Sequence, residues 1–396
     1  MLGRIYHTLW GRLEDNRELR RYYLHKLFAE IGNAAGARFT MSWFFFSGGI
    51  SVEQIIGIVM TYAATCLLIM EPTRRLINFL GVRRAFLLHV LPKLLSFTVL
   101  LYAVHLVYLG QNPGLLLNLW MVIHAFKVML SRVATTAYFT HFGQIESRGS
   151  DLGLATIFQK FAAIVAPVAL GALIEVEGIS VFIVIQTVFG LIASLMLGLK
   201  KDEGLQVYVH PFRYWHKVPL KVTKSFFFQN MPYFFMTDLF FIWLVIQFDG
   251  SYTVAGAFYG LKLAADMFLS WLVGKYTDLD KIRSFYITGV LLMALFWLLV
   301  PFSPNGMVVA ILQFTVGLAG LVVDIPFERT YYNMAKQSGD PVGWALWREV
   351  SIQSGILAGG FVCLIILQFV TDWHWLIMLG APASIAWLYL TPEKNK

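Results

Sequence analysis

The sequence predicts an all-α membrane protein with twelve transmembrane helices, divided into two halves of six. Of its 396 residues, 58% are hydrophobic and only 14% are charged, whereas soluble globular chains carry roughly 25% charged residues. A helix needs about 20 mostly apolar residues to cross a bilayer, and apolar stretches of this length recur along the whole chain. The lipid bilayer is therefore the first partner that the composition predicts.

Turn-forming residues divide the apolar sequence into separate spans. Glycine, proline and asparagine gather at several connections, among them 110–114 and 303–306. No cleavable signal is expected, because the polar first 21 residues lead into a full-length span instead of a short apolar core. The predicted spans are 22–47, 52–74, 84–108, 114–140, 151–174, 180–199, 224–247, 252–275, 284–301, 306–333, 342–369 and 372–390.

The basic residues predict the orientation of these spans. Every second connection is rich in Lys and Arg. Together with the terminal residues of the adjoining spans, these connections hold 22 of the 31 basic residues, whereas the alternate connections hold none. Basic connections stay on the cytoplasmic side of a membrane. We therefore expect a cytoplasmic membrane of the prokaryotic type, with both chain ends in the cytoplasm. The net charge of +8 then reflects topology, and no nucleic-acid partner is expected.

A polar segment divides the chain into three parts: a first half at 1–199, a linker at 200–223 and a second half at 224–396. The linker mixes lysines, aromatic residues and two prolines, which predicts a tether along the inner membrane surface. The two halves share features in the same order, because Tyr138 and Tyr331 each precede a polar turn followed by a glycine. The halves are therefore expected to be related.

These features resemble the major facilitator superfamily over essentially the whole chain. That family carries a motif after its second span: a glycine, an Asp-Arg pair, a second glycine and a basic pair. The first half keeps the second part of the motif, with Asn78 in place of the acid, and the second half keeps the first part. The matching positions are Gly81, Arg83 and Arg84, and then Gly274, Asp278 and Arg283.

The resemblance implies a major facilitator fold, in which two pseudo-symmetric six-helix bundles enclose a cavity at mid-membrane. It also implies transport by alternating access, with the cavity lined mainly by spans 1, 4, 7 and 10. We expect the motif residues to form a cytoplasmic gate together with Glu328, Arg348 and Glu349.

Nine basic residues fall inside the predicted spans, not counting the first and last residue of each span. A charge near the bilayer centre costs at least ~2.5–3.5 kcal/mol. Such a charge needs a partner, water or a route to the surface. In span 4, residues spaced by three or four form one stripe, and Arg132 flanks it. The predicted cavity residues are Asn33, Arg38, His124, Lys127, Ser131, Tyr233 and Gln313. The alternative is a buried ion pair such as Glu30 with Arg132, and Lys93 is expected to snorkel or pack locally.

The second half carries carboxylates inside its spans. A carboxylate held away from water favours its neutral form and can carry a proton, which makes Asp238 and Asp324 the candidates for proton coupling. The alternative is that each pairs with a cation of the first half. Lys262 and Asp266 lie one turn apart, where they can form an intrahelical pair. The candidates for coupling or ion pairing are Glu30, Arg132, Asp238, Lys262, Asp266 and Asp324.

We therefore expect a monomeric secondary active transporter of a small organic solute, coupled to protons. A basic wall facing an acidic wall favours a zwitterionic or amphipathic substrate. The main alternative is a receptor or scaffold that keeps the fold without transporting. An enzyme or an ATP-driven pump is not expected, because the sequence has no His-Glu-x-x-His, Gly-x-Ser-x-Gly or phosphate-loop motif. Cys66 and Cys363 lie in apolar stretches, so no metal site or cofactor is expected.

Overall fold

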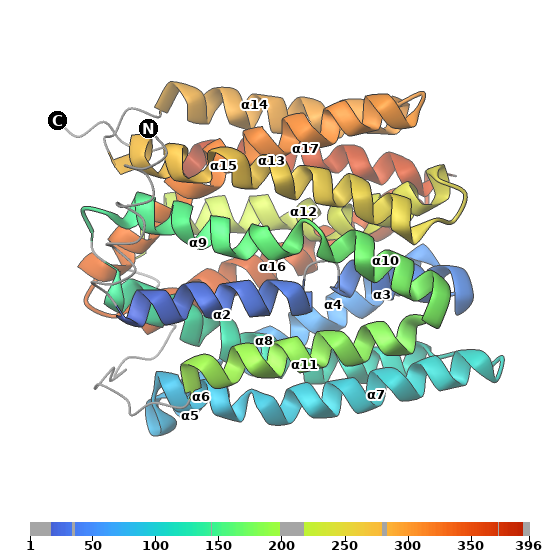
Figure 1. The fold of residues 1–396 in the computed structure, drawn as a ribbon, viewed down its shortest axis with the longest axis horizontal. Coiled ribbons are helices and arrows are strands. Elements are labelled where there is room, and N and C mark those ends of the chain that lie inside the picture. The colour runs from blue at the N-terminus through green and yellow to red at the C-terminus, as the bar shows by residue number, and fades with distance from the viewer. Residues whose placement is uncertain are drawn as a thin grey trace.

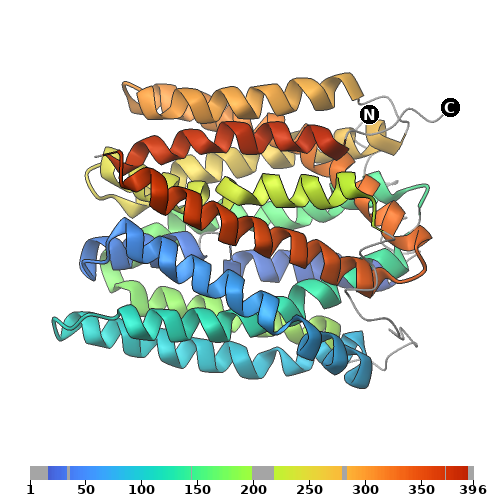
Figure 2. The same cartoon turned by 180° about the vertical axis from the view of Figure 1, so that it is seen from behind.

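Long helices run side by side along one axis in the computed structural model of the chain (Figure 1). The structure describes residues 17–33, 36–143, 145–198, 218–278, 283–370 and 372–390, and these contain no strand. Most of the predicted linker 200–223 lies outside this range. The first helix begins and the last helical segment ends at the same end of the bundle (Figures 1 and 2), as an even number of crossings requires.

Helices occupy the six predicted intervals of the first half. They are α2 (Arg17–Asn33), α3 (Gly36–Ser47), α4 (Val52–Leu68), α5 (Met70–Leu80), α6 (Val82–Leu88), α7 (Val90–Tyr108), α8 (Gly114–Phe142), α9 (Arg148–Ala163), α10 (Ala166–Glu177) and α11 (Ile179–Gly198).

The second half is helical in its six intervals as well. Its elements are α12 (Leu220–Gln247), α13 (Tyr252–Asp278), α14 (Arg283–Leu299), η2 (Val300–Phe302), α15 (Gly306–Gln337), α16 (Pro341–Leu367), η3 (Trp373–Leu379), α17 (Gly380–Ile385) and η4 (Ala386–Leu390). In the described part of the chain, seven helices are long and apolar enough to cross a membrane, or eight if α4 and α5 form one bent span. The count of twelve spans stays a prediction.

Three predicted spans differ from single straight helices. α4 and α5 meet at an angle of 52°. Arg74, the last residue of predicted span 2, lies within α5 and pairs with Glu71 at 2.6 Å. Span 5 breaks between α9 and α10, where Pro167 lies in the first turn of α10. Proline is tolerated there because a first-turn N–H has no partner within the helix. Span 12 consists of two 3₁₀ segments, η3 and η4, around the short helix α17.

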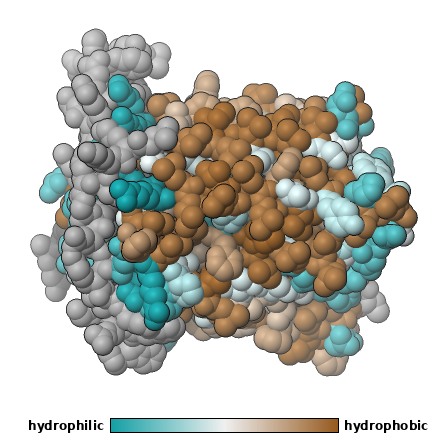
Figure 3. Space-filling model, turned by 90° about the horizontal axis from the view of Figure 1, so that it is seen from below, coloured by the Kyte–Doolittle hydropathy of each residue, from teal (hydrophilic) through white to brown (hydrophobic). Residues whose placement is uncertain are grey.

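Apolar side chains cover the outside of the molecule. Figure 3 shows a broad hydrophobic band, with hydrophilic side chains gathered toward both ends. Leu94 and Tyr102 on α7 and Leu291 on α14 are among the exposed large side chains of this surface. A soluble monomer rarely exposes so much contiguous apolar surface, whereas lipid solvates it. The molecule is therefore a multi-pass membrane protein.

Glycines hold the two halves in close contact. α13 lies along α9 and α10, and α16 lies along α4. A Cβ atom on Gly256 would lie 2.3 Å from the Pro167 carbonyl oxygen, and one on Gly260 would lie 2.7 Å from the Ile164 carbonyl oxygen. The helix backbones approach this closely only because neither glycine has a side chain.

Candidate functional site

A small pocket lies between the two halves, and we call it the inter-bundle pocket. Its volume is about 160 Å³, and its lining comes from α3 and α9 of the first half and from α12 to α15 of the second. It contains three cations and two carboxylates: Arg38, Lys160, Lys262, Asp266 and Asp324. Opposite charges from distant parts of the chain therefore meet at the boundary between the bundles.

An ion pair crosses the inter-bundle pocket from one half to the other. Lys160 Nζ on α9 lies 3.6 Å from Asp266 Oδ2 on α13. Arg38 donates a hydrogen bond to the Tyr259 hydroxyl, and its guanidinium carbon lies 4.7 Å from the centre of that ring. The partner predicted for Asp266 from helical spacing is Lys262, and Lys160 is not among the predicted site residues. Only the packing of α9 against α13 brings Lys160 and Asp266 together.

Two further polar groups, Asp324 and Gln313, line this pocket. Asp324 on α15 is exposed within the pocket lining, where Asp266 repels its charge and Lys262 and Lys160 attract it. Gln313 is only 1% exposed, and its Nε2 has no hydrogen-bond partner among the described residues. A buried donor without a partner is costly, so a ligand oxygen here would satisfy Gln313.

Asp238, the other predicted coupling residue, lies outside the lining of the inter-bundle pocket. It is 5% exposed on α12, and the charged group that acts on it is Arg38 of the first half. Asp238 therefore stays a candidate for proton coupling or ion pairing.

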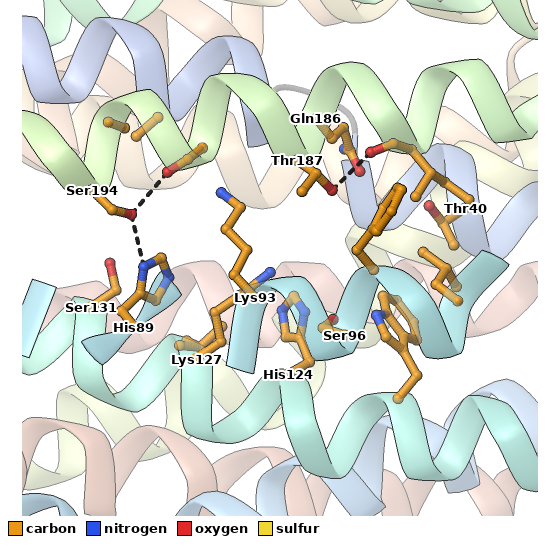
Figure 4. A pocket seen from close by; sticks show the side chains of 18 of the residues that line it. Thr40, His89, Lys93, Ser96, His124, Lys127, Ser131, Gln186, Thr187 and Ser194 are labelled. Carbon is orange, nitrogen blue, oxygen red and sulfur yellow. Dashed lines mark hydrogen bonds between the residues drawn. The ribbon is translucent and has the colours of Figure 1, made fainter. Parts of the chain in front are cut away.

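A second and larger pocket lies inside the first half, and we call it the N-bundle pocket (Figure 4). Its volume is about 350 Å³. His124, Lys127 and Ser131 line this pocket, whereas Arg38 and Gln313 line the inter-bundle pocket. The prediction that these five residues share one cavity is wrong. Helical spacing shows which residues share a face but not which helix that face meets. The predicted Asn33 and Tyr233 side chains lie outside the described residues.

Of the two alternatives predicted for Lys93, snorkelling to the surface is wrong, and the side chain packs inside the bundle. It is 9% exposed, and its side chain extends from α7 toward α11 inside the N-bundle pocket (Figure 4). Gly190 of α11 leaves the space for it, because a Cβ atom there would lie 1.2 Å from Lys93 Nζ. The signal in the sequence was the spacing of His89 and Lys93, which places two basic side chains on one helical face.

The predicted gate residues mostly make contacts within their own half. Arg83 pairs with Glu18 at 3.0 Å, and Arg348 pairs with Glu328 at 2.6 Å. Arg84 and Arg283 are exposed. Gly81 joins α5 to α6 with a φ of 85°, which favours glycine, and Gly274 packs on the Gly149 carbonyl across the bundle boundary. The Asp278 side chain lies outside the described residues.

Several contacts cross between the halves at the end where α2 begins. They are Arg132 to Glu349 (3.4 Å), Arg148 to Asn333 (3.1 Å), Lys336 to the Gly143 carbonyl (2.7 Å) and the Phe139 ring against the Tyr332 ring (5.0 Å). The alternative pair of Glu30 with Arg132 is wrong, because Glu30 instead accepts a hydrogen bond from Gln159 at 2.6 Å. Arg148 and Lys336 were visible in the sequence as the lone basic residues of their connections.

Glu175 closes the opposite end of the boundary. Its carboxylate accepts hydrogen bonds from Ser251 Oγ (3.0 Å), Thr253 N (2.9 Å) and Thr253 Oγ1 (2.6 Å) at the start of α13. A carboxylate there bonds a free backbone N–H and interacts favourably with the helix dipole. Phe39 of α3 also packs against Phe241 of α12, with 4.8 Å between ring centres. The inter-bundle pocket thus lies between two closed ends.

Replacing Arg83 by Met is expected to destabilise the first half. The Arg83 side chain is only 3% exposed, and after its removal Glu18 is still paired with Arg21 at 3.3 Å. The expected cost is therefore below the about 3–5 kcal/mol of a fully uncompensated buried charge, and the packing of Arg83 over the Tyr138 ring at 5.6 Å is lost as well. Thermal unfolding in detergent should show a clearly lower midpoint. Arg75→Met is the matched control, because Arg75 pairs with Glu71 with a side chain that is 75% exposed. Equal midpoints for the two variants would contradict the expected role of Arg83.

The sequence matches the family model of the Major Facilitator Superfamily over residues 27–346, and the chain belongs to this family. It is therefore a multi-pass membrane protein of a solute-transporter family and not an enzyme. No curated protein matches the sequence.

Solved transporters share its fold. A bacterial homologue of the iron transporter ferroportin, in an outward-facing state, is 13% identical over 94% of this chain and 98% of that chain, with a TM-score of 0.65. A variant of the E. coli fucose:proton symporter is 14% identical over 93% and 96%, with a TM-score of 0.61. The nucleoside transporter NupG is 12% identical over 95% and 100%, with a TM-score of 0.65. At such identities the likeness concerns the fold.

Proposed function

We propose that this protein is a proton-coupled secondary transporter that moves a small organic solute by alternating access. It acts as a monomer in a cytoplasmic membrane, with both chain ends in the cytoplasm. The observation that supports this most strongly is the inter-bundle pocket, where Arg38 and Lys160 of the first half face Asp266 and Asp324 of the second. The receptor or scaffold alternative gives no reason to retain these charges within the membrane, where each is costly.

The Lys160–Asp266 pair supplies a contact that a solute can replace. At 3.6 Å the two groups attract each other without a tight hydrogen bond. A zwitterionic solute offers a carboxylate to Lys160 and an ammonium group to Asp266, so both buried charges keep a partner while the halves separate. Without the solute, separation leaves the two charges uncompensated. Movement of the bundles is thereby linked to occupancy of the pocket.

Asp324 is the proposed proton carrier. Its carboxylate is accessible from the inter-bundle pocket, and the neighbouring carboxylate of Asp266 repels a second negative charge. Protonation of Asp324 removes this repulsion, and deprotonation restores it. A pocket that opens alternately to each side of the membrane can therefore load the proton on one side and release it on the other.

Alternating access predicts opposite movements at the two ends of the molecule. Spin-label pairs at Arg84 and Gln337, and at Val176 and Asp249, would report the two ends, because all four side chains are exposed. Each pair joins the two halves. On acidification, or on addition of a zwitterionic solute such as an amino acid or a betaine, one distance should lengthen as the other shortens. Distances that stay fixed under all these conditions would favour the receptor or scaffold alternative.

Replacing Glu175 by Ala is expected to favour opening of the end that Glu175 closes. The change removes the acceptor of three hydrogen bonds at the start of α13, each worth about 1–2 kcal/mol or more when the acceptor is charged. In the Val176–Asp249 spin-label pair, the population with the longer distance should rise. Glu177→Ala, two residues further on, is the control. An unchanged distance distribution would show that this end is held by other contacts.

A further inference from the structure

We propose that the N-bundle pocket is a binding site for a small organic anion with an apolar body. It shares no lining residue with the inter-bundle pocket, and it lies inside the first half and not at the boundary between the halves. The inference therefore stands independently of the proposed transport mechanism.

The charge of this pocket is entirely basic. Its lining contains two lysines, one arginine and three histidines, and no Asp or Glu. Arg132 has an acidic partner, Glu349, which belongs to α16. Among the described residues, no ion pair is found for Lys93 or Lys127, and these two ammonium groups repel each other. The pocket thus holds two like charges with no matching carboxylate.

Two unmatched ammonium groups inside a membrane-embedded bundle are costly, because burial removes the water that would stabilise them. Figure 4 shows Lys93 on α7 and Lys127 on α8 beside the same space. Lys93 extends across it toward Gly190 of α11, whose missing side chain leaves room for the ammonium group. An anion placed in this space meets both lysines and replaces their repulsion by attraction.

Hydrogen-bonding groups complete the site. Ser194 donates its hydroxyl hydrogen to the Gly190 carbonyl at 2.8 Å, so its oxygen accepts a hydrogen from His89 Nδ1, also at 2.8 Å. The His89 ring is thereby held in one orientation. His124 Nδ1 is buried and has no hydrogen-bond partner within the described part of the chain. His124 lies almost one helical turn before Lys127, so both side chains line the pocket from the same face of α8. The unpaired His124 Nδ1 is therefore close to the Lys127 side of the pocket.

The size and walls of the pocket indicate the class of ligand. A volume of about 350 Å³ falls in the range of small-molecule sites, which is roughly 300–1,000 Å³. Phe97, Leu100 and Trp120 supply an apolar wall, and Ser96 and Thr187 supply hydroxyls. An inorganic ion alone would make no apolar contact with this wall. The structure therefore favours a carboxylate or phosphate joined to a small apolar group, such as an aromatic ring.

Calorimetric titration of the purified protein in detergent tests this site without any transport assay. The probes are benzoate and phenyl phosphate, with benzamide as the neutral match for benzoate. We expect at least one of the two anions to bind roughly tenfold or more tightly than benzamide, the difference that one charge-assisted contact supplies. Equal binding of all three probes, or no binding by either anion, would overturn the proposal.

Lysine substitutions in each of the two pockets test whether the anion binds in the N-bundle pocket. Lys93→Met and Lys127→Met should each weaken binding of the anion roughly tenfold or more, whereas Lys127→Arg should retain it. Lys160→Met removes a cation of the inter-bundle pocket and should leave anion binding unchanged. Weakening by Lys160→Met but not by Lys127→Met would place the anion in the inter-bundle pocket and overturn the proposal.

Thermal unfolding distinguishes a variant that binds the anion less tightly from a variant whose fold is less stable. Without an anion, Lys127→Met should unfold at the same temperature as the unmodified protein or higher, because the change removes one of two repelling charges. With the anion present, the unmodified protein should gain stability through binding, and Lys127→Met should gain less at the same anion concentration. A lower midpoint for ligand-free Lys127→Met would show that the lysine supports the fold, and would overturn its assignment to a ligand.

Discussion

Replacing Asp324 by Asn should abolish proton-coupled transport while leaving the protein folded. Asparagine has nearly the same shape as protonated aspartic acid but cannot release a proton. The site would therefore be held in its neutral form, and the repulsion between Asp324 and Asp266 would be permanently absent. The variant should still change conformation, but without carrying a proton. Solute-driven acidification of proteoliposomes with an internal pH dye should fall to the level of empty vesicles.

The solutes in this assay are a panel of amino acids and betaines, since the proposed substrate class is zwitterionic. Asp249→Asn is the matched control, because Asp249 is exposed in the connection between α12 and α13 and should leave proton movement unchanged. If Asp324→Asn moves protons at the normal rate, Asp324 is not the carrier. Loss of proton movement in Asp266→Asn alone would assign the role to Asp266.

Replacing Gly256 by Leu should prevent the two halves from assembling. The first side-chain atom would lie 2.3 Å from the Pro167 carbonyl oxygen and 2.7 Å from its carbonyl carbon, which is well inside van der Waals contact. Both atoms belong to backbone and cannot rotate away. Overpacking in a well-packed core costs about 1–3 kcal/mol or more, and here the collision separates α13 from α10 along the seam. We expect a large fall in the yield of monodisperse protein and in its unfolding temperature.

Gly57→Leu is the control for this substitution, because a Cβ atom at Gly57 would have no other atom within 4 Å. The unfolding temperature of Gly256→Ala should lie between those of Gly256→Leu and Gly57→Leu, because alanine adds the colliding Cβ atom without the rest of the leucine side chain. A Gly256→Leu protein as stable as Gly57→Leu would show that the α10–α13 seam can open without loss of the fold.

Much of the architecture follows from local patterns in the sequence. Apolar stretches separated by turns predicted where the helices lie, and the alternation of basic connections predicted an even number of crossings. The residue types of the inter-bundle pocket were also predictable, because Gln313 and Asp324 recur on one face of a helix at intervals fixed by helical geometry. Both residues line the inter-bundle pocket in the structure.

The partners of the membrane charges could not be predicted in the same way. Glu30 bonds Gln159, Arg132 bonds Glu349, and Lys160 pairs with Asp266. Each of these contacts joins two helices that are distant in sequence, and it depends on how far each helix is rotated and shifted along its axis. A change of one residue in register turns a side chain by about 100° around its helix, so residues at similar depth can face different neighbours.

The sequence by itself determined the class of fold, the helical intervals and the set of charges that the membrane must accommodate, because these depend on composition and on spacing within single helices. Only the tertiary structure decided that the charges occupy two pockets instead of one. It also decided that Lys93 faces inward, where the missing side chain of Gly190 leaves room for its ammonium group. The physical reason is that contacts between helices depend on shape complementarity across the whole bundle, which no local pattern encodes.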